Sequence, residues 1–304
     1  MLVHISRGIA PALCALLLAS TAYAAQRTFA SPEDAVAALA QAVKANDRAA
    51  MLAVLGPEAE KSIRSPDRVA DRARADRFAA TYDEKHAIVR DGDSRASLTL
   101  GSDDFPFAFP LVKTGERWRF DTTAGVDELN ARRVGENELS VINVMLAIVD
   151  AQRDYASADR NRDGVREYAR KFASAQGRHD GLYWPTKAGE PPSPLGSLMS
   201  TATAEGYKQK SGPTPYHGYY FRMLTGQGPH AKGGALDYVV KGHMIGGFAV
   251  IAYPAQYAQT GVMTFIVNYD GVVYQKDLGP STAEVARKIT RYDPGDGWVA
   301  ASDK

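Results

Sequence analysis

The feature that most constrains the fold is a long stretch without helix breakers in the middle of the chain. Residues 128–158 contain no proline and one glycine, and Val141, Met145 and Tyr155 lie at helical spacing within them. A helix of roughly 30 residues would be about 45 Å long at 1.5 Å per residue. The stretch therefore predicts one long helix between two halves of different character. We place the division after residue 125.

The first half, residues 25–125, predicts helices followed by a β-meander. Ser31 and the Pro-Glu-Asp after it offer a hydroxyl cap, a proline in the first turn and acids at the positive end of the helix dipole. Asp47 can cap a second helix, and residues 67–80 predict a third, strongly charged one. Turn residues separate the short strands expected at 86–90, 94–100, 107–113 and 117–121.

This order of elements, with a meander that closes on Trp118-Arg119-Phe120-Asp121, resembles the cone-shaped nuclear-transport-factor-like fold. That fold serves both enzymes and binding modules, so the resemblance implies no function by itself. Where the pocket of that fold is used, it tends to hold an Asp–His pair or an arginine. The histidine in this half, His86, begins a strand, and we expect it at the surface.

The second half, residues 126–304, predicts a sheet behind the long helix. A polar loop at 159–164, a short helix at 166–174 and a proline-rich link at 185–194 come first. A small helix is expected at 198–204. Strands are expected at 218–224, 238–240, 247–253, 263–269 and 272–277. The fold class is therefore α+β.

Two motifs in this half carry a family resemblance. The runs GYYFRMLTGQG at 218–228 and GVMTFIVNYDGVVYQKDLG at 261–279 are similar to a bacterial exported family of unknown function. The resemblance implies export and a two-part architecture, and it brings no catalytic residue.

The second half also resembles the globular head of type IV pilins and pseudopilins. The likeness lies in a long helix with Ala-Gln-Arg-Asp-Tyr at 151–155, a Gly-Tyr-Tyr-Phe strand, an Ala-Tyr-Pro strand and a closing hairpin. Pilins carry an apolar helix directly after a prepilin cleavage site. Here a whole domain precedes the helix, whose first turns at 127–138 are charged. The resemblance therefore implies the fold of the pilin head alone.

The first 24 residues read as a secretory signal peptide. Arg7 precedes an apolar run at 9–19, which is shorter than the roughly 20 residues that a spanning helix needs. Ala22 and Ala24 form an Ala-x-Ala cleavage site. Cleavage would remove the single cysteine, Cys14, and leave no disulfide or thiolate. We therefore expect a periplasmic or secreted protein with no integral membrane segment after cleavage.

The sharpest chemical motif follows the long helix. Asp159, Asn161 and Asp163 alternate before Gly164, and Glu167 could close a shell of oxygen ligands around calcium. The full calcium loop has an acid at its twelfth position, where this chain has an arginine, and three further arginines lie in the segment. The alternative is a solvated turn in which Asp and Asn cap the next helix.

Patterns typical of catalysis are absent from the sequence. It contains neither G-x-S-x-G nor H-E-x-x-H, and histidines 86, 179, 217, 230 and 243 lack the spacing of metal ligands. An envelope hydrolase would have to use the glycine-rich loop Gly226–Tyr238, with candidates His230, Lys232 and Asp237. The sequence therefore leaves enzymatic activity open and favours a non-enzyme.

The formal net charge of +1 argues against nucleic acid as a partner, because nucleic acid binding requires a basic face. The favoured function is non-catalytic binding or assembly in the cell envelope, with an envelope protein or a small ligand as partner. The alternatives are the envelope hydrolase and a pilus- or secretion-associated subunit.

The signal peptide yields a direct prediction. Signal peptidase reads the small residues Ala22 and Ala24, so the mature chain should begin at Ala25. Intact-mass measurement of periplasmic material checks the new amino terminus. Recovery of the full-length chain in the membrane fraction would contradict the prediction.

Overall fold

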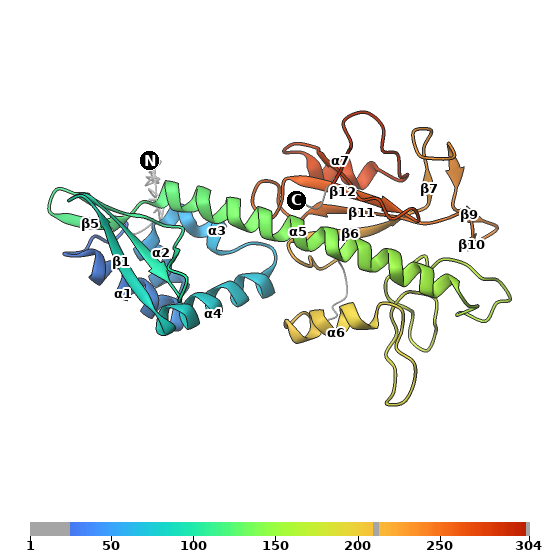
Figure 1. The fold of residues 1–304 in the computed structure, drawn as a ribbon, viewed down its shortest axis with the longest axis horizontal. Helices are drawn as coiled ribbons and strands as arrows, with labels where there is room; N and C mark the ends of the chain where they lie inside the picture. The colour runs from blue at the N-terminus through green and yellow to red at the C-terminus, as the bar shows by residue number, and fades with distance from the viewer. Residues whose placement is uncertain (1–24, 209–212, 302–304) are drawn as a thin grey trace, which may run out of the picture.

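The computed structural model describes residues 25–208 and 213–301 and has an α+β fold (Figure 1). The signal peptide expected at 1–24 lies outside these residues. Two groups of helices and strands lie along one long helix, α5, Thr122–Ala156. Among the described residues, no helix combines the length and apolarity needed to cross a membrane.

Helix α5 extends the predicted helix at its amino-terminal end. The Asp121 side chain accepts a hydrogen bond from the backbone N–H of Ala124 and caps the helix directly after the last strand of the first half. Its 35 residues rise about 52 Å. The division expected after residue 125 therefore falls in the first turn of α5.

The first half begins with four α-helices: α1 Pro32–Lys44, α2 Arg48–Leu55, α3 Glu60–Ile63 and α4 Arg68–Glu84, with a 3-10 turn, η1 Pro57–Ala59, before α3. The sheet that follows has the order β1-β2-β4-β5, with β3 paired to β2. Its strands are β1 His86–Asp91, β2 Arg95–Leu100, β3 Phe105–Pro106, β4 Leu111–Thr114 and β5 Arg117–Phe120. All the pairings are antiparallel.

The strand predicted at 107–113 is broken, because Pro106 and Pro110 flank its first part. Proline has no N–H to give to a ladder and is confined to strand edges and ends. Phe109 instead turns into the core, where it is 1% exposed. A Cβ at Gly125 would come within 2.0 Å of the Phe109 ring, so α5 can pack closely here because it has glycine.

The second half is built on an antiparallel sheet of order β14-β13-β12-β11-β6. These strands are β6 Tyr219–Leu224, β11 Ala249–Pro254, β12 Met263–Asn268, β13 Tyr274–Asp277 and β14 Val299–Ala300. Two small ribbons pair β7 Gly226–Gln227 with β8 Leu236–Asp237, and β9 Val239–Val240 with β10 His243–Met244. The other helices of the described residues are α6 Gly196–Ala204 and α7 Thr282–Lys288.

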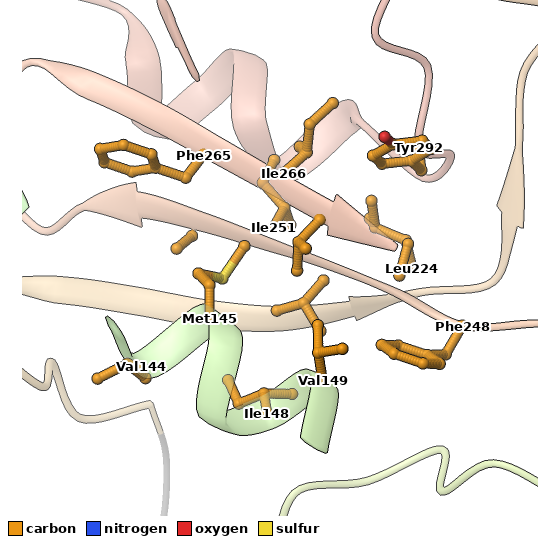
Figure 2. Packing of buried hydrophobic residues seen from close by; sticks show 14 of the residues in the cluster. Val144, Met145, Ile148, Val149, Leu224, Phe248, Ile251, Phe265, Ile266 and Tyr292 are labelled. Carbon is orange, nitrogen blue, oxygen red and sulfur yellow. The ribbon is translucent and has the colours of Figure 1, made fainter. Parts of the chain in front are cut away.

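The sheet of the second half is covered on both faces. Helix α5 lies under one face, and α7, which the sequence analysis missed, lies on the other (Figure 1). Figure 2 shows Met145, Ile148 and Val149 of α5 directed toward Leu224 and Ile251 of the sheet. All five side chains are at most 2% exposed. The helical stripe predicted from sequence is thus the stripe that forms this core.

The helix predicted at 166–174 is wrong, because this segment is extended and finds its hydrogen bonds elsewhere. The side chain of Gln152 accepts a hydrogen bond from the Ala169 N–H and donates one to the Ala169 carbonyl, both at 2.8 Å. The Tyr168 N–H donates to the carbonyl of Met244 at 2.9 Å. The segment therefore wraps the end of α5.

A buried carboxylate joins the two halves. Asp67 is 3% exposed. It caps α4 through the Ala70 N–H at 3.1 Å. Its other oxygen accepts hydrogen bonds from the Tyr207 hydroxyl at 2.8 Å and the Gly218 N–H at 2.9 Å. These two donors belong to the second half, so one side chain serves both a helix cap and the junction.

We expect Asp67→Ala to destabilise the protein by about 3 kcal/mol, because it removes a cap and leaves two donors without their acceptor. Urea unfolding measures the change. Asp47→Ala is the matched control: Asp47 caps α2 through the Ala50 N–H but is exposed, so its loss should cost about 1 kcal/mol. Equal losses for the two variants would show that the junction adds nothing to the cap.

Candidate functional site

The loop after α5 is held by Asp159. One oxygen of its carboxylate accepts the Asp163 N–H at 3.2 Å, and the other accepts the Gly164 N–H at 2.9 Å. Gly164 has a φ of +89°, in the left-handed region that glycine adopts without strain. Both carboxylate oxygens of Asp159 are thus hydrogen-bonded to the loop backbone.

The other three predicted ligands lie together. The side-chain amide of Asn161 donates hydrogen bonds to Asp163 at 2.7 Å and to Glu167 at 2.8 Å. Glu167 is 9% exposed and accepts the Met244 N–H at 2.8 Å with its second oxygen. Rotation of the Asn161 amide by half a turn would direct its oxygen between Asp163 and Glu167, and would break the hydrogen bond that this oxygen accepts from the Asp163 N–H at 3.3 Å. The loop therefore places one amide and two carboxylates around a common centre.

The structure adds a histidine that the sequence analysis missed. The Nδ1 atom of His243 lies 3.5 Å from an oxygen of Asp163 and 3.5 Å from an oxygen of Glu167. This nitrogen is buried and has no hydrogen-bond partner among the described residues. Ligand atoms of the three side chains all lie within 4.8 Å of one another. No local spacing could reveal this group, because β10 comes from a distant part of the chain.

The cluster borders a cavity of about 980 Å³. Its basic lining residues outnumber its acidic ones; they are Arg160, Arg162, Arg170, Lys171 and Arg178, against Asp163, Glu167 and Asp180. Tyr155, in the last turn of α5, donates a hydrogen bond to the His179 carbonyl at 2.6 Å. Burial, and then the charge of Glu167, raise the pKa of the Tyr155 hydroxyl to about 12, so it stays protonated as a donor.

The arrangement has the donor set of a divalent-cation site. Carboxylate and amide oxygens suit calcium, whereas a neutral imidazole nitrogen is a ligand for zinc and other transition metals. Asp163, Glu167, His243 and Asn161 could together supply oxygen and nitrogen ligands. Asp159 would have to exchange its backbone hydrogen bonds for a bond to the ion.

The three residues of the glycine-rich loop proposed for a hydrolase do not share one partner. His230 pairs with Asp293 at 3.1 Å, and Asp237 forms an ion pair with Arg291. Lys232 is exposed. The histidine of the first half, His86, also lies exposed, with its ring stacked on Tyr82 at 3.8 Å.

The fold and this cavity define an α+β protein with a candidate ion site at the end of its central helix. The chain belongs to the family described as "Protein of unknown function (DUF2950)", whose model matches residues 26–301. This match confirms the resemblance to a family of unknown function. No curated protein and no solved structure matches the chain.

The His230–Asp293 pair makes a pH prediction. The hydrogen bond to Asp293, and then its charge, raise the pKa of the exposed His230 imidazole. A raised folded pKa stabilises the folded state below the unfolded pKa and loses that effect as pH rises through the folded pKa. NMR titration of the ring protons should give a midpoint above the usual histidine value. Asp293→Asn should lower it, and an unchanged midpoint would contradict the assignment.

Proposed function

We propose that the protein is exported and acts without catalysis, as a binding protein of the cell envelope. Its ligand site is the cavity at the end of α5, and the first ligand is a divalent cation. The observation that carries the proposal is the convergence of Asp163, Glu167 and His243, from two distant segments, on one point of that cavity. The predicted signal peptide supports a periplasmic or secreted localisation.

The two candidate ions would bind different side chains of the site. Calcium would use the loop itself, through Asp159, Asn161, Asp163 and Glu167, as the sequence predicts. The orphaned nitrogen of His243 favours a second candidate, zinc or a similar transition metal, which would use the imidazole with the two carboxylates. The two candidates differ in their dependence on His243.

A bound cation would also make the cavity attractive to anions. It would neutralise Asp163 and Glu167, and Asp180 already pairs with Lys171 at 2.7 Å. Arg162 and Arg178 line the cavity and form no ion pair within the described part of the chain. We therefore propose a small anionic molecule as the second ligand.

The other proposed functions have less support from the geometry. A hydrolase would depend on the Gly226–Tyr238 loop, whose His230 and Asp237 have separate partners. An assembly subunit would use an apolar face of α5, on which the exposed large apolar side chains are Leu139 and Leu146. We therefore favour binding.

The finer fold resemblances stay proposals. Helices packed on a curled meander support the nuclear-transport-factor-like interpretation of the first half. A long helix under an antiparallel sheet supports the pilin-head interpretation of the second.

A calcium titration tests the site. At 10 mM calcium and a Kd of about 1 mM, mass action adds about 1.4 kcal/mol to the free energy of unfolding. For a chain of this size that raises Tm by about 3 °C. Asp163→Asn should abolish the increase, because it removes the charge and keeps an oxygen for the Val165 N–H. Asp159→Ala should abolish it too, and should also lower Tm without metal.

Zinc and a control variant complete the experiment. His243→Ala should remove a Tm increase caused by zinc and leave one caused by calcium. Asp150→Asn is the matched control, since Asp150 is 79% exposed on α5 and lies outside the cavity lining. A Tm that neither metal raises, or that rises equally in Asp163→Asn, would reject the cation site.

A further inference from the structure

A second cavity, of about 430 Å³, lies in the first half, between α2, α3, α4 and α5. Most of its apolar walls come from these helices and from the segment between β3 and β4; they include Leu55, Ile63, Phe78, Phe107, Phe109 and Leu129. The volume lies within the range of small-molecule sites. This cavity is separate from the candidate ion site, with which it shares no lining residue.

One charged side chain is buried in the wall of this cavity. Arg133 of α5 is 3% exposed. One of its terminal nitrogens donates a hydrogen bond to the Ser62 carbonyl, and its Nε and Nη1 atoms are buried with no hydrogen-bond partner among the described residues. Buried donors are almost always satisfied, so two orphaned donors on one guanidinium indicate a missing acceptor.

The nearest carboxylate does not supply that acceptor. Asp71 lies 3.8 Å from the bonded Arg133 nitrogen, beyond hydrogen-bond distance. Its oxygens already accept the Ser65 N–H at 2.7 Å and the Ser65 hydroxyl at 2.9 Å. Burial lowers the pKa of Arg133 to about 10, so the side chain keeps its charge at neutral pH. The ion pair with Asp71 thus leaves two N–H donors of Arg133 without an acceptor in the part of the chain that the structure describes.

The surroundings explain how the space persists and what charge enters it. Helix α4 has a strongly charged sequence, and none of its residues is fully buried. It therefore covers one side of the cavity and leaves the space open. Arg64, Arg68 and Arg72 lie exposed at the rim. Arg64 forms no ion pair within the residues described. A rim of this sign raises the local concentration of anions.

We propose that this cavity binds a single-chain amphiphile with a carboxylate head, of the fatty-acid class. The carboxylate accepts hydrogen bonds from the free donors of Arg133, and the alkyl chain lies against the aromatic and aliphatic walls. A neutral lipid could accept a hydrogen bond from Arg133 but would bring no negative charge to the guanidinium, and a small inorganic anion would leave the apolar walls in contact with water. The amphiphile satisfies both.

Calorimetric titration of the mature protein tests the proposal, with a chelator present so that the ion site takes no part. Dodecanoate, decanoate, octanoate and dodecan-1-ol are compared below their aggregation limits. Dodecanoate should bind at least about tenfold more tightly than the alcohol, because its carboxylate brings a negative charge and a second acceptor oxygen to the guanidinium. Affinity should rise about fourfold per methylene. Equal affinity for acid and alcohol, or no dependence on chain length, overturns the proposal.

Substitutions test whether Arg133 binds the carboxylate of dodecanoate. Arg133→Met keeps the apolar bulk and should remove the preference for dodecanoate over the alcohol. Arg153→Met is the matched control on the same helix, because Arg153 is 55% exposed and lies outside the cavity. Arg68→Met, at the exposed rim, should weaken dodecanoate by about two- to threefold. If Arg133→Met keeps the full preference, Arg133 is not the anchor and the proposal is wrong; if that variant does not fold, the wild-type comparison of acid with alcohol decides.

Discussion

Helix α5 contributes side chains to both hydrophobic cores, and the rest of the structure depends on this shared helix. Val126 and Leu129 pack on the core of the first half, and Met145, Ile148 and Tyr155 pack in the core of the second. Burial of one such side chain contributes about 1.5–3 kcal/mol. Neither core is complete without its part of the same helix, so the two halves share one structural element.

Polar groups are concentrated where the helix passes from one core to the other. Asn137 donates to the Thr260 carbonyl at 2.8 Å and accepts from Arg74 at 3.0 Å. Glu138 accepts the N–H groups of Val262 and Met263 at 2.8 and 2.9 Å. Because these side chains hold defined partners, the halves meet in one register.

The sequence was a good guide wherever a local pattern was decisive. The apolar stripe predicted α5, and the caps at Ser31 and Asp47 marked the starts of α1 and α2, where their side chains accept the expected backbone N–H groups. Prediction from the sequence failed where contacts between distant residues determine the structure. Gln152 fixes Ala169 in an extended segment that reads as a helix, and α7, a seven-residue helix, has too few residues for a clear period. His243 joins the candidate ion site only through the tertiary fold, and Arg133 stands out only because its surroundings leave it without an acceptor.

A continuous helix through two cores also restricts how such a gene can change length. Each residue turns an α-helix by about 100°. One residue inserted between Leu129 and Val141 would rotate everything after it and turn Met145 and Ile148 away from the sheet, while the first core stayed as it was. Insertions in the exposed loop at 185–192 would not change which side chains of the helix face the sheet. Length variation in the family should therefore accumulate in the loops, and the helix between the two cores should keep a fixed number of residues.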